Sequence, residues 1–230
     1  MSQPHFDKDF FTFFKELKAN NNRDWFNENK AHYEASVAEP CLDFIAAMAT
    51  PLQKISPHFD AIPKKVGGSM FRIYRDTRFS KDKTPYKTNA GLHFRHNRSK
   101  TNYAPGFYLH LAPGEVFMGA GIWGPDGPTL AKIRAHIDEN QEDWLKVTNA
   151  KGIQDRFGGL REGNPLKRPP KGYSADHPLV DDLKKRSFFM MQDTNETAAT
   201  HTDFLGQVTD TYKAAAPLVE FICDALDVPF

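Results

Sequence analysis

Four segments in the middle of the chain alternate apolar and polar side chains, and this alternation constrains the fold more than any other feature. They cover residues 70–75, 90–96, 106–111 and 115–123. Successive side chains of a strand point to opposite faces, so each segment is predicted to be a β-strand with one buried face. Short links favour antiparallel pairing, and Pro113-Gly114 is a hairpin signal. The alternation therefore predicts a four-stranded antiparallel meander.

Apolar residues recur at helical spacing on both sides of these segments. They predict three helices within residues 7–55 and a last helical region that begins near Thr200. A short buried strand is also expected at residues 188–191. The helices carry too many large apolar residues to stand alone, so we expect an α+β fold in which the N- and C-terminal helices cover one face of the sheet. The residues predicted for that covered face are Phe71, Ile73, Leu92, Phe94, Leu109, Leu111 and Met118.

Composition limits the class of protein. The chain has 230 residues, 40% of them hydrophobic, and no long polar linker, which favours a single domain over residues 1–230. A net charge of +1 argues against a protein that coats nucleic acid over its whole surface. No apolar run reaches the roughly 20 residues of a membrane span, so no membrane partner is expected. Cys41 and Cys223 fall in apolar helical patterns, which predicts buried thiols and a cytoplasmic location.

Positive charge is concentrated in residues 71–88, between the first two predicted strands. The basic side chains are Arg72, Arg75, Arg78, Lys81, Lys83 and Lys87. Only Asp76 and Asp82 oppose them, so six positive charges less two negative ones leave +4. Arginine binds phosphate or carboxylate through two parallel hydrogen bonds, which suits an anion site. The alternative is a solvated loop held by local ion pairs, and in both cases we expect Asp76 and Asp82 to pair with neighbouring Arg or Lys.

The same segment carries a family resemblance. Arg-Ile-Tyr-Arg-Asp-Thr-Arg-Phe-Ser-Lys-Asp-Lys-Thr-Pro-Tyr-Lys-Thr, residues 72–88, resembles the signature of the family called domain of unknown function 2461. Further similar motifs are Asn-Asn-Arg-Asp-Trp-Phe at 21–26, Tyr-Leu-His at 108–110 and Leu-Lys-Arg-Pro-Pro-Lys-Gly-Tyr at 166–173. The resemblance spans nearly the whole chain. It implies a single soluble α+β domain, mainly bacterial, and it implies no reaction and no catalytic residue.

If the four strands keep their register, their uncovered faces bring polar side chains together. The ligand-binding candidates are Arg72, Tyr74, Arg95, Tyr108, Gly119 and Gly121 on the strands, with Arg75, Arg78, Lys81, Lys83 and Lys87 on the loop at the rim. The two glycines leave room for a ligand near the backbone, or else they mark a bulge or close packing. Such a convergence of polar groups predicts an anion-binding cleft over the sheet.

Three functions remain open from the sequence. The first is binding of a phosphate- or carboxylate-bearing small molecule. The second is binding of nucleic acid, since Phe79 and Tyr86 interleave with the basic residues and suit base stacking. The third is an enzyme acting on a phosphorylated or carboxylated substrate, with His93 or His110 as general acid or base and Asp76 orienting it. Convergence of both histidines and a carboxylate within hydrogen-bond reach would favour the enzyme.

Neither a metal nor a cofactor is expected. His93 and His96 point to opposite faces of a predicted strand, and the sequence has no zinc-type His/Cys spacing, phosphate-binding glycine loop or dinucleotide fingerprint. A second basic cluster, Lys167, Arg168 and Lys171, surrounds two prolines in the C-terminal half. The sequence leaves open whether this cluster joins the first one.

Overall fold

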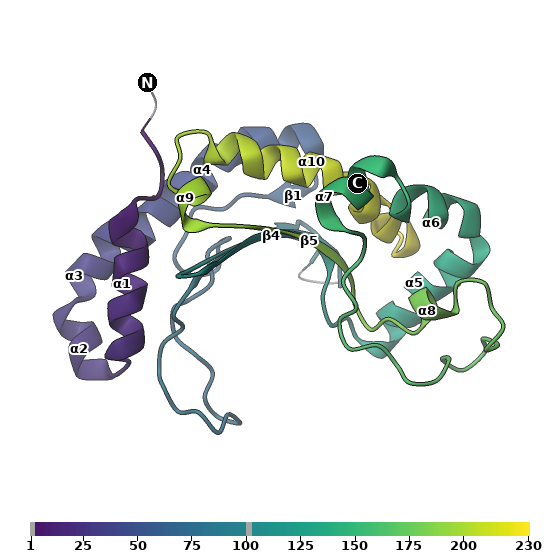
Figure 1. Ribbon diagram of the computed structural model, residues 1–230, viewed down its shortest axis with the longest axis horizontal. Coiled ribbons are helices and arrows are strands. Elements are labelled where there is room, and N and C mark those ends of the chain that lie inside the picture. The colour runs from purple at the N-terminus through teal and green to yellow at the C-terminus, as the bar shows by residue number, and fades with distance from the viewer. Residues whose placement is uncertain (1–2, 100–102) are drawn as a thin grey trace.

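The computed structural model describes residues 3–99 and 103–230, and its centre is an open antiparallel sheet of five strands (Figure 1). The strands are β1 (Phe59–Asp60), β2 (Ala90–His96), β3 (Gly106–Ala112), β4 (Glu115–Ile122) and β5 (Phe188–Thr194). They lie side by side in chain order, and every neighbouring pair is antiparallel. The α+β class and the antiparallel meander through β2, β3 and β4 are confirmed, whereas the expected count of four strands is wrong.

Residues 70–75, predicted as the first strand, do not form one. They make only two isolated bridges, Met70 to Leu92 and Tyr74 to Tyr86. Beyond Phe71 the segment folds back on its own loop, where Arg75 N–H donates to the carbonyl of Pro85 (2.9 Å). Phe71 N–H still donates to the carbonyl of Gly91 in β2 (2.9 Å), but Arg75 bonds within the loop, so side-chain alternation alone misled the prediction.

Both edges of the sheet come from other parts of the chain. β1 pairs with the last residues of β2. β5 contains the strand expected at 188–191 and pairs along nearly all of β4. Because about 65 residues of helix and loop separate β4 from β5, local sequence patterns do not indicate this pairing.

Helices precede the sheet, interrupt it after β4 and close the fold. The N-terminal group comprises α1 (Lys8–Ala19), α2 (Arg23–Glu28), α3 (Lys30–Tyr33), the π-helical turn η1 (Glu34–Ala38) and α4 (Glu39–Ile55). After β4 come α5 (Gly127–Glu139), α6 (Gln141–Thr148), α7 (Lys151–Phe157) and α8 (Val180–Leu183). The last two are α9 (Glu196–Ala199) and α10 (Phe204–Ala225). The Asp7 carboxylate accepts from Phe10 N–H (3.0 Å) and so caps α1.

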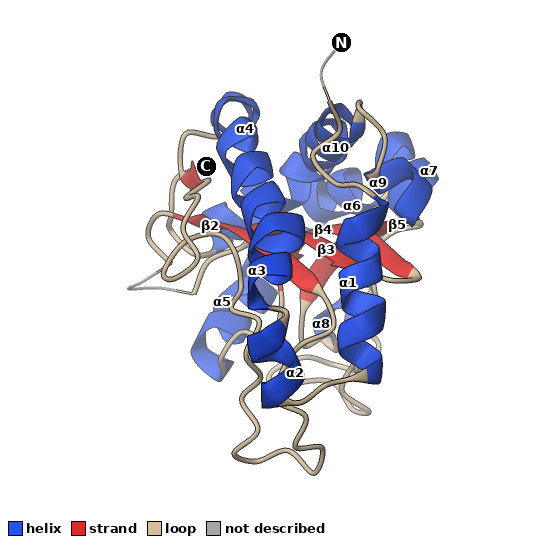
Figure 2. Ribbon diagram, turned by 90° about the vertical axis from the view of Figure 1, so that its left-hand side faces the viewer, coloured by secondary structure: helices blue, strands red, loops and turns tan. Residues whose placement is uncertain are grey.

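The two faces of the sheet differ. Figures 1 and 2 show α4 and α10 lying over one face, which we call the covered face. On this face Tyr212 of α10 packs against Phe94 and Phe107, with ring centroids 5.9 and 4.9 Å apart. The opposite, open face carries Gly91, His93 and Arg95 of β2, Gly106, Tyr108 and His110 of β3, Phe117, Gly119 and Gly121 of β4, and Phe189 and Met191 of β5.

Of the seven residues predicted for the covered face, six are buried in the core and one is not. The buried ones are Ile73, Leu92, Phe94, Leu109, Leu111 and Met118. Phe71 is the exception, because it leaves the sheet with its segment and lies against His93 and Tyr108 on the open face. Cys41 and Cys223 are buried free cysteines, which confirms their predicted burial. No helix in the described residues is long and apolar enough to cross a membrane.

Candidate functional site

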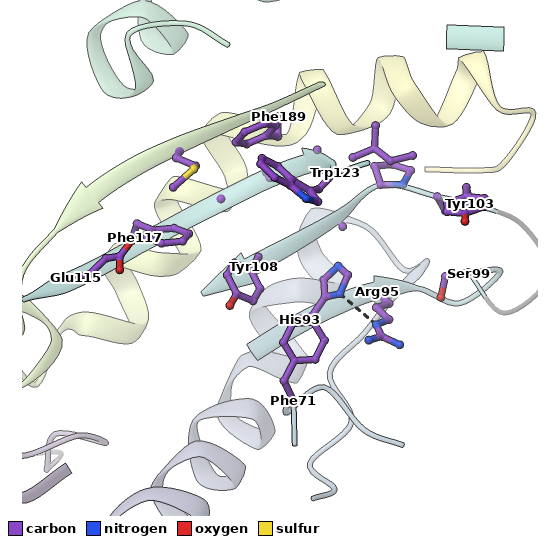
Figure 3. Close-up of a pocket in the computed structure, with 18 residues that line it drawn as sticks. Phe71, His93, Arg95, Ser99, Tyr103, Tyr108, Glu115, Phe117, Trp123 and Phe189 are labelled. Carbon is purple, nitrogen blue, oxygen red and sulfur yellow. Dashed lines mark hydrogen bonds between the residues drawn. The ribbon is translucent and has the colours of Figure 1, made fainter. Parts of the chain in front are cut away.

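A cavity of about 660 Å³ lies on the open face of the sheet (Figure 3). Its volume is within the range of small-molecule sites, about 300–1,000 Å³. Glycine backbone from β3 and β4 forms part of its floor, at Gly106, Gly119 and Gly121. Aromatic side chains form most of its walls: Phe71, Tyr103, Tyr108, Phe117, Trp123 and Phe189. The cavity can therefore enclose a flat, largely apolar group.

The two glycines of β4 have different roles. Gly121 has a φ of 124°, and a Cβ there would lie 2.1 Å from the Phe188 carbonyl oxygen, so close approach of β5 requires glycine. Gly119 has no such constraint, because the nearest atom to its Cβ would be 3.5 Å away. Both interpretations of these glycines therefore apply, close packing at Gly121 and open cavity space at Gly119.

Two further glycines, Gly91 and Gly106, were not among the predicted site residues, and they let the polar rings lie across the sheet. A Cβ on Gly91 would come within 2.5 Å of the Tyr108 hydroxyl, and one on Gly106 within 2.5 Å of His93 Nε2. Each ring therefore occupies the space that a side chain on the neighbouring strand would fill. The sequence pattern already places Gly91 on the same strand face as His93. Only the pairing of β2 with β3 shows which rings lie over the glycines.

His93 is held as a neutral imidazole. Arg95 Nε donates to its Nδ1 at 3.1 Å, as the dashed line in Figure 3 marks, so the ring proton is on Nε2. Burial and the Arg95 charge lower the pKa of His93 to about 4. Phe71 packs on its other side, with ring centroids 5.8 Å apart. At neutral pH His93 can therefore donate a hydrogen bond to a ligand but carries no charge.

Tyr108, His110 and Glu115 form a chain of polar groups. The Tyr108 hydroxyl lies 3.2 Å from His110 Nδ1, and His110 Nε2 lies 3.8 Å from the Glu115 carboxylate. Phe117 stacks on the His110 ring at 4.6 Å and fixes its plane. Burial lowers the pKa of His110 although Glu115 opposes the shift, and burial raises the pKa of Tyr108 to about 12. Tyr108 therefore keeps its proton at neutral pH, and His110 can accept a hydrogen bond from it.

Opposite charges lie at the two ends of the cavity. Figure 3 shows Arg95 at one end and Glu115 at the other. The Arg95 guanidinium also lies 5.5 Å from the centroid of the Phe71 ring. Trp123 packs on Phe189 at 4.6 Å and is still 71% exposed, so a large apolar ring faces solvent at this cavity. The arrangement suits a ligand with an anionic group near Arg95 and a ring between the aromatic walls.

The basic loop, residues 71–88, is held by its own ion pairs. Arg75 pairs with Asp82 at 2.5 Å, and Arg78 pairs with Asp76 at 2.7 Å, which confirms the expected pairing of both carboxylates. Lys83 donates to the carbonyl of Thr77 (2.9 Å). These contacts favour a structural role for the two acids.

The structure brings only some of the predicted site residues together. His93, Arg95, Tyr108, Gly119 and Gly121 line the cavity, and His110 adjoins it through Tyr108. The residues of the basic loop are not among those that line it: Arg72, Tyr74, Arg75, Asp76, Arg78, Lys81, Lys83 and Lys87. The physical reason is that the segment leaves the sheet after Phe71 and carries these side chains with it.

Asn21 ties the basic loop to the N-terminal helices. Its side-chain amide donates to the carbonyl of Tyr86 (2.9 Å) and accepts from Tyr86 N–H (3.1 Å). Tyr86 is buried, and its ring stacks on Phe26 at 4.1 Å. Tyr74, by contrast, is 57% exposed and contacts Tyr86 from outside. The sequence placed Asn21 at a helix break and gave no sign of this contact.

Across residues 3–99 and 103–230, no group of three or more His, Cys, Asp or Glu side chains is placed to hold a metal ion. His93 and His96 lie on opposite faces of β2. His96 is buried, and its Nε2 donates to the carbonyl oxygen of Pro229 (2.8 Å).

The fold and the cavity define an α+β protein with a candidate ligand site on the uncovered face of an antiparallel sheet. The chain belongs to the conserved hypothetical protein family DUF2461, whose profile matches residues 9–221. The resemblance seen in the sequence motifs is therefore confirmed. No curated protein and no solved structure matches the chain.

Proposed function

We propose that the cavity binds a small molecule that combines a planar ring with an anionic group, either phosphate or carboxylate. The observation that carries this proposal is the position of Arg95 beside an aromatic-walled space of about 660 Å³. Arg95 uses Nε to donate to His93, and among the described residues no carboxylate pairs with its guanidinium. Its terminal nitrogens therefore remain available for a bidentate contact with an oxyanion.

The rest of the cavity supports the same ligand class. Phe71, Trp123 and Phe189 offer ring faces and edges for stacking, which is worth most for a flat aromatic group. Neutral His93 adds a hydrogen-bond donor, and Glu115 at the far end can accept from N–H groups of a heterocycle. The proposed anion site thus keeps Arg95 from the sequence-based candidates and leaves out the basic loop.

Calorimetry tests the proposal by comparing the binding of adenosine monophosphate with the binding of two fragments of it. Adenosine has the ring without the phosphate, and ribose 5-phosphate has the phosphate without the ring. We expect the nucleotide to bind more tightly than either fragment. Arg95→Gln should weaken nucleotide binding about 10- to 100-fold, since a hydrogen bond to a charged group contributes roughly 1.5–3 kcal/mol, and should leave adenosine binding nearly unchanged.

Lys54→Gln is the matched control. It removes the same charge from an exposed residue near the end of α4, on the side of the covered face. Equal losses in Arg95→Gln and Lys54→Gln would mean diffuse electrostatics and no defined site. A ring-bearing carboxylate, indole-3-carboxylate, tests the other anionic group. No binding of either anion at low salt would refute the proposal.

The chain of Tyr108, His110 and Glu115 favours a second candidate, an enzyme that transfers a proton to its ligand. Tyr108 would be the acid, because burial keeps its hydroxyl protonated, and the Glu115 carboxylate, 3.8 Å from His110 Nε2, would support His110 electrostatically. Glu115 thus takes the place that the sequence analysis gave to Asp76, which pairs with Arg78 in the basic loop.

The enzyme hypothesis is tested by incubating the protein with a mixture of phosphorylated and carboxylated metabolites and following their consumption by mass spectrometry. A compound consumed by the wild type but not by Tyr108→Phe, with nucleotide binding retained in the variant, would support catalysis. Consumption at equal rates by both proteins would exclude Tyr108 as the acid.

A further inference from the structure

Two basic loops lie on the open side of the sheet. The first is residues 71–88, and the second is the long connection between α7 and α8, residues 158–179. Figures 1 and 2 show both loops extending away from the sheet on the side opposite α4 and α10. In Figure 1 they lie on either side of the concave underside of the sheet. The cavity lies on that same face, so the two loops flank the space in front of it.

The basic side chains on both loops are available for contact. In the first loop Arg72, Lys81 and Lys83 are exposed, and in the second Lys167, Arg168 and Lys171 are exposed. Within the described residues, none of these six forms a direct ion pair with a carboxylate, although the charge of Arg72 also acts on Asp76. Lys83 donates to a carbonyl, and the acids of the first loop pair directly with Arg75 and Arg78. No direct ion pair in the described structure therefore neutralises these six positive charges.

An aromatic ring stands among these charges at the tip of the first loop. Phe79 is 94% exposed, and the Arg78 guanidinium lies 5.8 Å from its centroid. Burying a phenyl ring is favourable, so full exposure beside cations marks a surface suited to a partner that offers both flat rings and negative charge. Nucleic acid has both at a short repeat, whereas an acidic peptide offers charge with few rings.

We infer that the open face binds single-stranded nucleic acid, with its phosphates on both basic loops and one base in the cavity. The inference rests on the proposed function of the cavity and names its ligand as a nucleotide within a polymer. A mononucleotide on Arg95 would leave the six cations of the loops unused, whereas a strand laid across the face reaches both loops at once. The base in the cavity must be unpaired to enter, which favours a single strand over a duplex.

Fluorescence anisotropy of a labelled single-stranded oligonucleotide about 12 nucleotides long, as DNA and as RNA, tests the inference. The double variant Lys81→Gln/Lys83→Gln weakens the first loop, and Lys167→Gln/Lys171→Gln weakens the second. Lys54→Gln/Lys213→Gln, on exposed positions of α4 and α10, is the control with the same charge change. A duplex of the same sequence and vesicles with anionic lipid are the alternative ligands.

The oligonucleotide is expected to bind at least about 10-fold more tightly than adenosine monophosphate at low salt. The affinity falls as salt rises, and for single strands the slope of log affinity against log salt is about −0.7 for each phosphate contact. Each loop variant removes two lysines, so its slope should be less steep by about 1.4. The control should leave the slope unchanged. Neither loop variant should alter binding of the mononucleotide, and Trp123→Ala should weaken both ligands.

Several results would overturn the inference, and one distinguishes it from the proposed function. If adenosine monophosphate binds through Arg95 but the oligonucleotide binds no more tightly, the cavity proposal stands and the nucleic-acid inference fails. If the oligonucleotide binds through both loops but no mononucleotide binds and Trp123→Ala has no effect, both the cavity proposal and the entry of a base are wrong. Equal binding of the duplex, a loss as large in the control as in the loop variants, or binding to vesicles alone would each overturn the inference.

Discussion

His93 should make the stability of the protein depend on pH in a way that can be calculated. Its pKa is lowered from the ordinary 6.5 to about 4, because burial and the neighbouring Arg95 disfavour the imidazolium. As pH falls below 6.5, the unfolded chain takes up a proton on His93 that the folded protein does not. The stability contributed by neutral His93 is therefore fully present above pH 6.5 and is lost as pH falls toward 4.

The magnitude follows from the two pKa values. The full difference between the unfolded and folded pKa of His93 corresponds to about 3 kcal/mol of folding stability. Between pH 7 and about pH 4.5, His93 should lower the free energy of unfolding by about 2 kcal/mol. His93→Gln removes the titrating group, and its amide can still accept from Arg95. Three other histidines with a lowered pKa, His5, His96 and His110, titrate in both proteins and so cancel in the comparison.

Urea denaturation at the two pH values is the assay. The free energy of unfolding should fall by about 2 kcal/mol more in the wild type than in His93→Gln. Equal losses in the two proteins would refute the reasoning. If the variant does not fold, a pH titration of the wild type, followed by the chemical shift of the His93 ring, gives the pKa directly. A titration midpoint near pH 6.5 would show that the imidazole is not buried beside Arg95.

The other predictions concern the core, the floor of the cavity and the loop. Phe94→Ala should cost about 3–5 kcal/mol in urea denaturation, since the ring is fully buried, and a loss below about 1 kcal/mol would contradict its place under Tyr212. Gly121→Ala should destabilise by more than about 1 kcal/mol, because of its positive φ and the contact with β5, whereas Gly119→Ala should cost less; the opposite order would show that the β4–β5 packing is different. Asn21→Ala removes both hydrogen bonds to Tyr86, so it should cost about 1–3 kcal/mol and speed proteolysis within residues 75–84, and unchanged cleavage would mean that this clamp does not hold the loop.

The central strands could be predicted because one face of each is buried in the core. Burial of Leu92, Phe94, Leu109 and Met118 imposes the period of two that the sequence displays. The same parity put His93 and Tyr108 correctly on the open face. The pairing of β5 with β4 could not be predicted in this way, because the two strands come from distant parts of the chain and no local pattern encodes their contact.

The candidate site was harder to predict than the sheet, and residues 70–75 show why. Phe71 and Ile73 alternate with Arg72 and Tyr74 as in a strand. In the structure Met70 and Ile73 are buried in the core, whereas Phe71 lies in the wall of the cavity. Periodicity cannot separate a strand from an extended loop with anchored side chains. The high local charge drew the predicted site toward the loop, although Asp76 and Asp82 neutralise part of it.

A crystal structure of the protein with adenosine monophosphate tests the proposed site most directly. We expect a phosphate oxygen within about 3 Å of the Arg95 guanidinium and the base ring between the aromatic walls, near Phe71 and Trp123. A phosphate bound at Arg72 or Lys81 on the basic loop, with the base outside the cavity, would contradict it.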